Sequence, residues 1–223
     1  VDGRSLGALE WNGDTALQFR RDILKPFFDQ YLVPGAPKAD TPPVLVYDTG
    51  ANRWDRLQAW PVSCAQGCAA KSKPLYLRAG GALSFEPPAA GQGEYDEYVS
   101  DPAKPVPYLP RPVSFGDREG WTTWLVHDQR FVDGRPDVLT WVSEPLTEPL
   151  RIAGEPKVHL QASTTGSDSD WVVKLIDVYP ETVASRPEMG GYQLPLALTI
   201  FRGRYRESLE TAKAIEPGKV LAY

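Results

Sequence analysis

Ser5 is the first residue in the chain whose setting suggests catalysis. Residues 3–7 read GRSLG and match G-x-S-x-G, a pattern in which a strained turn between a strand and a helix lifts a serine hydroxyl toward a substrate. Only Val1 and Asp2 precede the motif, which leaves no strand before it, and the first helical pattern begins only at Asp14. We therefore expect the match to be coincidental.

The histidines decide whether any serine could act as a nucleophile, because the serine needs a histidine base and a carboxylate that orients it. His127 adjoins Asp128 in a segment with strand character, where neighbouring side chains point to opposite faces. His159 alternates with Val158 and Leu160, which predicts a solvent-facing position on a strand. We therefore predict no catalytic residue here, and a self-sufficient enzyme with an unfamiliar site is the least favoured hypothesis.

One acidic turn of the sequence has the spacing of possible metal ligands. Asp168 and Asp170 lie two apart in a Ser- and Gly-rich turn, where they could bind calcium or accept hydrogen bonds from nearby backbone amides. Calcium needs about six to eight oxygen ligands, so the turn interpretation is favoured. No metal and no cofactor are predicted.

The two cysteines, Cys64 and Cys68, have three residues between them, including Gly67. This spacing permits a small disulfide-closed loop, and two free thiols are the alternative. A zinc site is disfavoured because it needs four ligands and both histidines are distant in the sequence. An oxidised pair would place the protein in the periplasm or outside the cell, whereas reduced thiols would fit the cytoplasm.

Trp121 and Trp124 are the two tryptophans whose spacing permits one ring to line a cleft. They belong to seven tryptophans and ten tyrosines, most of which should be core, although exposed aromatic rings could stack on a sugar or an aryl group. The segment 120–126, GWTTWLV, predicts a strand, on which residues three apart lie on opposite faces. One indole is then buried and the other lines a cleft.

The charge and the hydropathy of the chain argue against two classes of partner, nucleic acid and membrane. A formal net charge of −5 argues against a nucleic-acid surface, which needs clustered Lys and Arg. Arg202, Arg204 and Arg206 alternate along a predicted strand and are best explained as a solvated face. No apolar run reaches the roughly 18 residues that cross a bilayer, so no membrane partner is expected.

The elements that would position these side chains begin with a helix. Asp14 is a suitable N-cap, and apolar residues follow it at spacings of three and four as far as Leu32. Pro26 lacks a backbone donor and should kink or divide the helix, and Pro34-Gly35 should end it.

After this helix the pattern changes to short strands, and the 19 glycines and 22 prolines among 223 residues favour a mainly β architecture. Lys157–Ser163 alternates and should cover a core on one face, whereas Trp171–Tyr179 is apolar on both faces, as in a central strand covered twice. Ser100–Pro112 carries five prolines and should be an extended loop. The predicted strands are Val44–Tyr47, Leu75–Leu77, Leu83–Phe85, Trp121–Val126, Val138–Val142, Lys157–Ser163, Trp171–Tyr179 and Leu194–Phe201.

Four long phrases of the sequence are more specific than any short motif. They are YVSDPAKPVPY (98–108), WTTWLVHDQRFVDGRPDVLTW (121–141), SEPLTEPLRIAGEPKVHLQASTTGSDSDWVVKLIDVYP (143–180) and FRGRYRES (201–208). They resemble the C-terminal part of α-amino-acid ester hydrolases, which are grouped with glutaryl acylases, cocaine esterase and X-Pro dipeptidyl-peptidases. The likeness extends over nearly the whole chain.

The resemblance implies a particular domain organisation. Such enzymes join an α/β-hydrolase catalytic domain and a helical cap to a C-terminal jelly-roll (galactose-binding-like) β-sandwich, and they cleave esters or amides with a Ser-His-Asp triad. Residues 1–42 would be the helical tail of the α/β-hydrolase domain. Residues 43–223 would be the sandwich, which we expect to be truncated because a strand begins at Val220. The triad and the carboxylates that hold the substrate ammonium would lie upstream of Val1, so no catalytic residue is carried over.

The resemblance therefore predicts a portion of a serine hydrolase for α-amino acyl esters and β-lactam amides, acting by hydrolysis or acyl transfer. Its partners would be the upstream catalytic domain and a small amino-acyl ester or amide, and a homo-oligomer is compatible with it. The portion itself would shield one wall of the active site and shape substrate access. Because such enzymes bring the sandwich against the catalytic pocket, the resemblance implies that Trp121 and Trp124 line the substrate site. The competing hypothesis is a stand-alone carbohydrate-binding or interaction β-sandwich module, since a fold does not decide a function.

Overall fold

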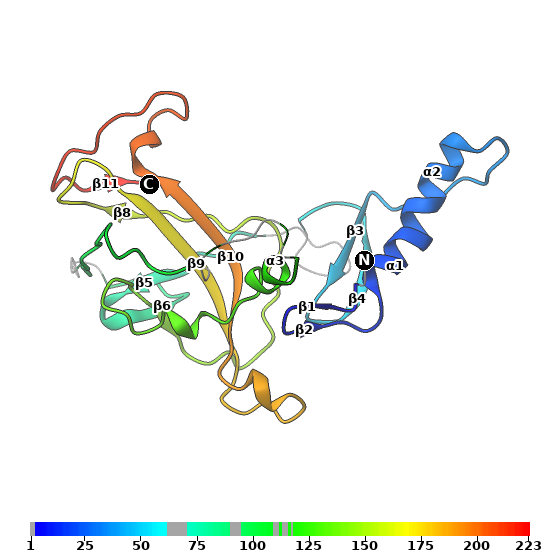
Figure 1. The fold of residues 1–223 in the computed structure, drawn as a ribbon, viewed down its shortest axis with the longest axis horizontal. Coiled ribbons are helices and arrows are strands. Elements are labelled where there is room, and N and C mark those ends of the chain that lie inside the picture. The colour runs from blue at the N-terminus through cyan, green and yellow to red at the C-terminus, as the bar shows by residue number, and fades with distance from the viewer. Residues whose placement is uncertain (1–2, 62–70, 90–94, 109–111, 113–115, 117) are drawn as a thin grey trace. The chain divides into compact units, whose positions relative to one another are not determined.

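The computed structural model describes residues 3–61, 71–89, 95–108, 112, 116 and 118–223. The chain forms two compact units, one of Val1–Leu125 with Phe131–Gly154 and one of Val126–Arg130 with Glu155–Tyr223. The architecture is mainly β with few helices, and the strands among the described residues form several small sheets of two or three strands (Figure 1). The mainly β prediction is confirmed. Along these residues no helix combines the length and the apolarity that crossing a membrane requires.

The first unit begins with a hairpin, a helix and a second hairpin. These elements are β1 (Ser5–Leu6), β2 (Leu9–Glu10), α1 (Thr15–Phe19), the π-helical η1 (Arg20–Leu24), α2 (Lys25–Leu32), β3 (Val44–Asp48) and β4 (Arg53–Leu57). Later elements of this unit are β5 (Tyr76–Arg78), the 3-10 turn η2 (Ala79–Gly81), β6 (Ala82–Ser84), α3 (Arg118–Trp124) and β7 (Val142–Ser143). The 3-10 turn η3 (Gln129–Phe131) has its first two residues in the second unit. β1–β2, β3–β4 and β5–β6 are antiparallel, and β7 joins β6 in parallel.

The helix begins and divides where the sequence predicts. The Asp14 side chain accepts a hydrogen bond from the Leu17 backbone N–H at 2.8 Å, which satisfies one of the unpaired donors of the first turn. Pro26 cannot donate a backbone hydrogen bond, and the turn before it widens, so that the N–H of Lys25 bonds to the carbonyl of Arg20 five residues earlier. The prediction that Pro26 divides the helix is confirmed.

An aromatic cluster attaches α1 to the β3–β4 hairpin. The ring of Trp54 stacks on Phe19 with centroids 6.2 Å apart and meets Tyr47 edge-on at 5.1 Å. Its indole N–H donates to Gln18 Oε1 at 2.8 Å. Tyr47 and Trp54 are direct cross-strand neighbours, which is the pairing that stabilises a short hairpin.

The second unit is organised around one long hairpin (Figure 1). Its elements are β8 (Gln161–Ala162), β9 (Asp170–Val178), the 3-10 turn η4 (Pro187–Met189), β10 (Gln193–Arg202), the 3-10 turn η5 (Gly203–Tyr205) and β11 (Leu221–Ala222). β9 and β10 pair antiparallel along their whole length, with one bulge between Pro195 and Ala197 that accommodates the missing proline donor. β11 pairs with β8, and Leu160 and Tyr223 extend that ladder by two further backbone bonds.

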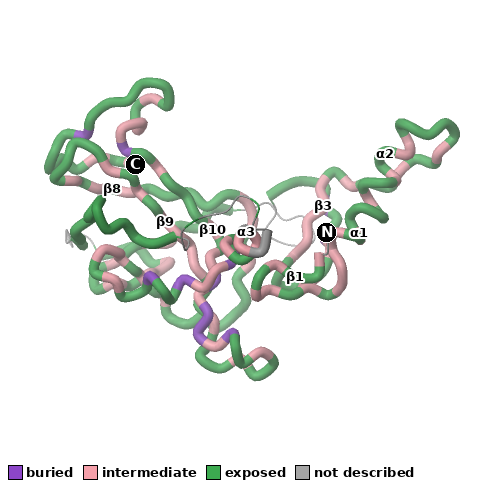
Figure 2. The backbone as a smooth tube through the Cα atoms, viewed as in Figure 1, coloured by how far each residue is buried: buried purple, intermediate pink, exposed green. Residues whose placement is uncertain are grey.

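Most of the fully buried apolar side chains belong to this second unit (Figure 2). They are Val126, Met189, Tyr192, Leu194 and Ile215, with Leu57 and Val132 in the first unit. Gly203 is required at its position because a Cβ there would lie 2.7 Å from both the Ile215 side chain and the Ser169 carbonyl. The helix Thr15–Leu32, by contrast, has no fully buried residue.

Four strand predictions are wrong in whole or in part. Trp121–Val126 is not a strand, since residues 118–124 form α3 although their β-branched and aromatic residues favour strands. Val138–Val142 and Lys157–Ser163 shrink to the two-residue strands β7 and β8. Trp171–Tyr179 is a strand, but β10 is its one neighbour among the described strands, and Val172 is 56% exposed, so β9 is not a central strand covered on both faces.

Candidate functional site

Ser5 lies in a hairpin strand, where its surroundings do not form a nucleophile elbow. It is exposed in β1 and pairs with Glu10 of β2. Gly3, the first glycine of the motif, is explained by packing, because a Cβ there would lie 2.3 Å from the Ala16 backbone nitrogen. The Gly3 N–H also donates to Asp14 Oδ1 at 2.9 Å, so this segment supports the start of α1.

The carboxylate beside His127 has a structural use. Asp128 Oδ1 accepts from the backbone N–H groups of Arg130 at 3.1 Å and Gln193 at 3.2 Å, and Oδ2 accepts from Arg130 Nε at 2.7 Å. Burial raises the pKa of Asp128, but these hydrogen bonds outweigh it and hold the pKa below its usual value. His159 is exposed, as predicted, but it precedes β8 instead of lying on a strand, and its neighbour Val158 is exposed as well.

Asp128 is part of a clamp that holds the segment 126–130 on the β9–β10 hairpin. The buried hydroxyl of Tyr192 donates to the Val126 carbonyl at 2.5 Å, and Lys174 Nζ donates to Gln129 Oε1 at 2.5 Å. Arg130 Nη1 donates to the Gly190 carbonyl at 3.2 Å. The half-buried position of Lys174 lowers its pKa. Local sequence patterns do not predict this clamp, because its partners are 45 to 66 residues apart.

The acidic turn is engaged by arginines. Arg204 lies 2.8 Å from Asp168 and Arg202 lies 3.6 Å from Asp170. Across the described residues, no group of three or more His, Cys, Asp or Glu side chains is arranged to hold a metal ion. These pairs agree with a structural use of the turn.

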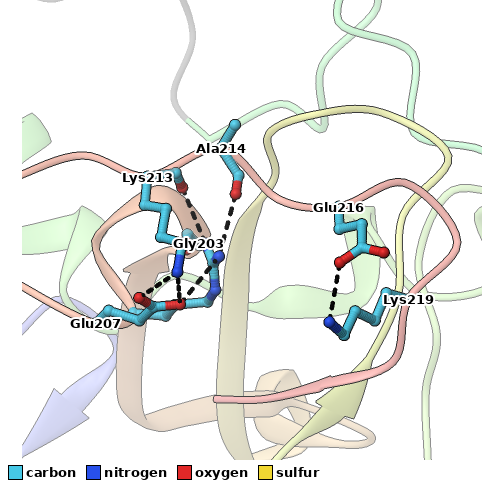
Figure 3. A network of polar contacts seen from close by, with 7 residues as sticks. Gly203, Glu207, Lys213, Ala214, Glu216 and Lys219 are labelled. Atoms are coloured by element: carbon cyan, nitrogen blue, oxygen red, sulfur yellow. Dashed lines mark hydrogen bonds and ion pairs between the residues drawn. The ribbon is translucent and has the colours of Figure 1, made fainter.

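The prediction of a solvated arginine stripe is wrong for Arg206. β10 ends at Arg202, the chain turns through η5, and the Arg206 side chain is only 9% exposed. Its guanidinium donates to the carbonyls of Gly203 at 3.2 Å, Lys213 at 2.9 Å and Ala214 at 3.1 Å. Figure 3 shows these carbonyls converging from the two sides of the loop. Arg206 therefore closes the loop between β10 and β11.

A shallow groove of about 290 Å³ borders this loop. Lys213 Nζ reaches both oxygens of Glu207, at 2.9 and 2.7 Å, and this bond lowers the pKa of Glu207. Lys219 pairs with Glu216 at 2.9 Å (Figure 3). Each of these side chains already has a partner of opposite charge, so the groove does not select a charged ligand.

The aromatic candidates lie on α3 rather than on a strand. Trp121 and Trp124 are three apart on this helix, so the strand alternation that predicts opposite faces for them does not apply. The side chain of Trp121 is outside the described part of the structure. Trp124 is half-buried, and its ring meets Tyr108 edge-to-face with centroids 5.3 Å apart and planes at 75°.

Tyr108 and Trp124 also share a hydrogen bond between their side chains. Indole N–H groups donate only, so the phenol oxygen of Tyr108 is the acceptor. Burial raises the pKa of Tyr108, and the hydrogen bond from Trp124 opposes that shift. Sequence reasoning had not singled out Tyr108.

Two other predictions meet different outcomes. Cys64 and Cys68 lie outside the described residues, so the disulfide stays a prediction. A sugar-binding surface would present coplanar exposed rings. The exposed ring pairs of α2 are instead edge-to-face, with Phe27 and Phe28 at 78° and Phe27 and Tyr31 at 65°.

The family of the chain is shown by its sequence. The X-Pro dipeptidyl-peptidase C-terminal non-catalytic domain matches residues 37–222. This match covers well over half of the chain, and the chain therefore belongs to that family.

Three relatives extend the comparison. An α-amino acid ester hydrolase, solved with selenomethionine, is 73% identical with a TM-score of 0.92, over 100% of this chain and 36% of that one. An aminopeptidase from the marine sediment archaeon Thaumarchaeota archaeon is 53% identical with a TM-score of 0.91, over 100% of this chain and 35% of that one. The cocaine esterase of Rhodococcus sp. (strain MB1 Bresler) is 30% identical over 88% of this chain and 32% of its own length. The chain thus spans about a third of each relative, and these relatives confirm the predicted resemblance.

Proposed function

We propose that this chain is the C-terminal, non-catalytic portion of a serine hydrolase that acts on α-amino acyl esters and amides, including β-lactam acyl amides. The observation that carries the proposal is the 73% identity to an α-amino acid ester hydrolase over 100% of the chain. The match to a non-catalytic domain supports a shaping role rather than a chemical one. The portion would shield one wall of the active site and control access, with Trp121 and Trp124 lining the acyl side.

The proposal includes a division of the chain near residue 42 and a jelly-roll sandwich after it. The family match begins at residue 37 and the strands begin at Val44, which supports a boundary in this region. The residues before it are nevertheless shared with the ester hydrolase, since that likeness covers the whole chain. Residues 1–42 then belong with the catalytic domain.

The exposed apolar side of the helix fits that assignment. Apolar side chains that are 37–73% exposed follow one another along η1 and α2: Leu24, Phe27, Phe28, Tyr31 and Leu32. Isolated exposed apolar residues are ordinary, but a contiguous row marks an interaction surface. The upstream catalytic domain is the partner that we propose for it.

The test compares the isolated polypeptide with the full-length protein that carries it. An α-amino acid methyl ester should be hydrolysed by the full-length protein and left intact by the isolated chain. Ser5→Ala in the full-length protein should leave the rate unchanged, because Ser5 is an exposed hairpin residue. Turnover by the isolated chain that disappears in Ser5→Ala would overturn the proposal.

The lining residues have their own test in the full-length protein. Trp121→Ala and Trp124→Ala should each lower kcat/KM for an ester with an aryl side chain more than for one with an alkyl side chain. Equal kinetics of both variants and the wild type on both esters would remove the assignment.

A further inference from the structure

Tyr108 and Trp124 form a pair whose geometry is fixed by two different contacts. Their rings meet at 5.3 Å and 75°, which is the edge-to-face arrangement that aromatic rings prefer. The two side chains also share a hydrogen bond, in which the Trp124 indole N–H is the donor. Together the contacts select one orientation of Trp124.

Each ring is carried by backbone with little freedom. Tyr108 follows Pro105-Val106-Pro107, and proline fixes the backbone angle φ near −65°. Upstream, Asp101 closes a turn by accepting the N–H of Ala103 on its side chain at 2.9 Å and the N–H of Lys104 on its carbonyl at 3.0 Å. Trp124 is the last residue of α3. Because the two rings are already held in position, ordering them when a ligand binds costs little entropy.

The pair still offers aromatic surface. Tyr108 is 43% exposed and Trp124 is half-buried, so neither ring is used up by core packing. Small-molecule sites are lined mainly by such rings, with a few polar groups that fix orientation. The surface therefore suits a flat apolar group better than a flexible alkyl chain.

We infer that Tyr108 is a positioning residue, which holds the indole of Trp124 in the orientation that receives the aryl side chain of an α-amino acyl substrate. This inference rests on the proposed function and adds a determinant of substrate choice within it. Tyr108 acts through Trp124. Its removal should therefore change the preference between substrates and leave the chemical step itself intact.

The experiment measures kcat/KM of the full-length protein on two α-amino acid methyl esters, one with an aryl and one with an alkyl side chain. Tyr108→Ala should lower the value for the aryl ester by about three- to tenfold and change the alkyl ester by less than about twofold. Tyr108→Phe retains the ring and loses the hydroxyl, so a smaller loss of about two- to threefold on the aryl ester is expected. Tyr98→Ala is the matched control, because Tyr98 lies in the same segment and is 40% exposed.

A double variant separates positioning from direct contact. If Tyr108 acts through Trp124, adding Tyr108→Ala to Trp124→Ala should cause no further loss on the aryl ester. Additive losses, equal losses on both esters, or a change of preference in Tyr98→Ala as large as in Tyr108→Ala would each overturn the inference. A wild-type protein that cleaves neither ester would refute the proposed function and this inference with it, whereas an active wild type with an unaltered preference in Tyr108→Phe and Tyr108→Ala refutes the inference alone.

Discussion

The helix Thr15–Leu32 and the β9–β10 hairpin are both rich in apolar residues, yet they use their polar groups in different ways. Along η1 and α2 the ion pairs, Arg21 with Asp22 and Lys25 with Asp29, are exposed. Such pairs contribute at most about 1 kcal/mol. The hairpin instead has the buried hydroxyl of Tyr192 on the Val126 carbonyl. The helix carries its ion pairs on the surface, whereas polar groups of the hairpin form hydrogen bonds to other segments of the chain.

This difference indicates where each element obtains its stability. The second unit contains most of the fully buried apolar residues and the clamp on residues 126–130, so it should remain ordered through its own contacts. The helix has no fully buried residue, and the proposed catalytic domain would supply the packing that it lacks. A single helix of this length is marginally stable in water without such packing.

Arg206→Ala should have the largest effect on the free energy of unfolding. Loss of the guanidinium leaves three loop carbonyls without their donor, and we expect a loss of about 2–4 kcal/mol. Urea unfolding followed by tryptophan fluorescence would measure it. Arg204→Ala is the matched control, since its pair with Asp168 is more exposed and should be worth less than about 1 kcal/mol. Equal effects would contradict the role of Arg206 in closing the loop.

Tyr192→Phe tests the clamp directly against the helix. Removing the hydroxyl orphans the buried Val126 carbonyl, and about 1–2 kcal/mol of unfolding free energy should be lost. Tyr31→Phe on α2 makes the same chemical change at a side chain that is 71% exposed, and it should stay within about 0.5 kcal/mol. Urea midpoints of the two variants should differ clearly, and identical midpoints would remove the contrast between the regions.

Asp128 predicts how the clamp responds to acid. Its pKa is lowered in the folded state, so its contribution is complete above the unfolded value of about 3.9 and is lost as the pH falls through the lower folded value. Asp128→Asn should cost about 1 kcal/mol at pH 7 and should flatten the loss of stability below about pH 4. Unfolding curves at pH 7, 5 and 3 would show this. A variant with the same acid dependence as the wild type would exclude the clamp as its source.

In the isolated chain, Phe28→Ser should have the smallest of these effects on the free energy of unfolding. The ring is 49% exposed, and its loss should change the unfolding free energy by no more than about 0.5 kcal/mol. In the full-length protein the same change should cost more, about 2–3 kcal/mol, if the catalytic domain covers this side of the helix. Comparing the two backgrounds by thermal unfolding decides the question, and a small effect in both would show that another surface is the partner.

Local patterns were the reliable part of the prediction from sequence. The cap at Asp14, the division at Pro26 and the strands near Val44 and Leu194 depend on residues close together, and the structure confirms them. The sequence predicts a strand over Trp121–Val126 because aromatic and β-branched residues favour one, but tertiary context places residues 118–124 in a helix.

The candidate site was harder to predict. The proximity of Tyr108 to Trp124, and of Tyr192 to Val126, results from chain folding over distances that periodicity does not encode. Arginine is usually a surface residue. Arg206 is buried because the loop after it folds back and supplies the carbonyls of Lys213 and Ala214 as hydrogen-bond acceptors. The long sequence phrases carry the family resemblance. The short G-x-S-x-G match is coincidental, because Gly3 is required by its close packing against Ala16.

The widened turn ahead of Pro26 has a rotational consequence. One additional residue in a helical turn advances every later side chain by about 100° around the axis. The rings of Phe27 and Tyr31 on α2 are therefore out of the regular α-helical register with Phe19 of α1, which stacks on Trp54. If the proposed catalytic domain covers α2, the helical segment would contact its own hairpin through α1 and that domain through α2, and the widened turn between them would couple the two contacts.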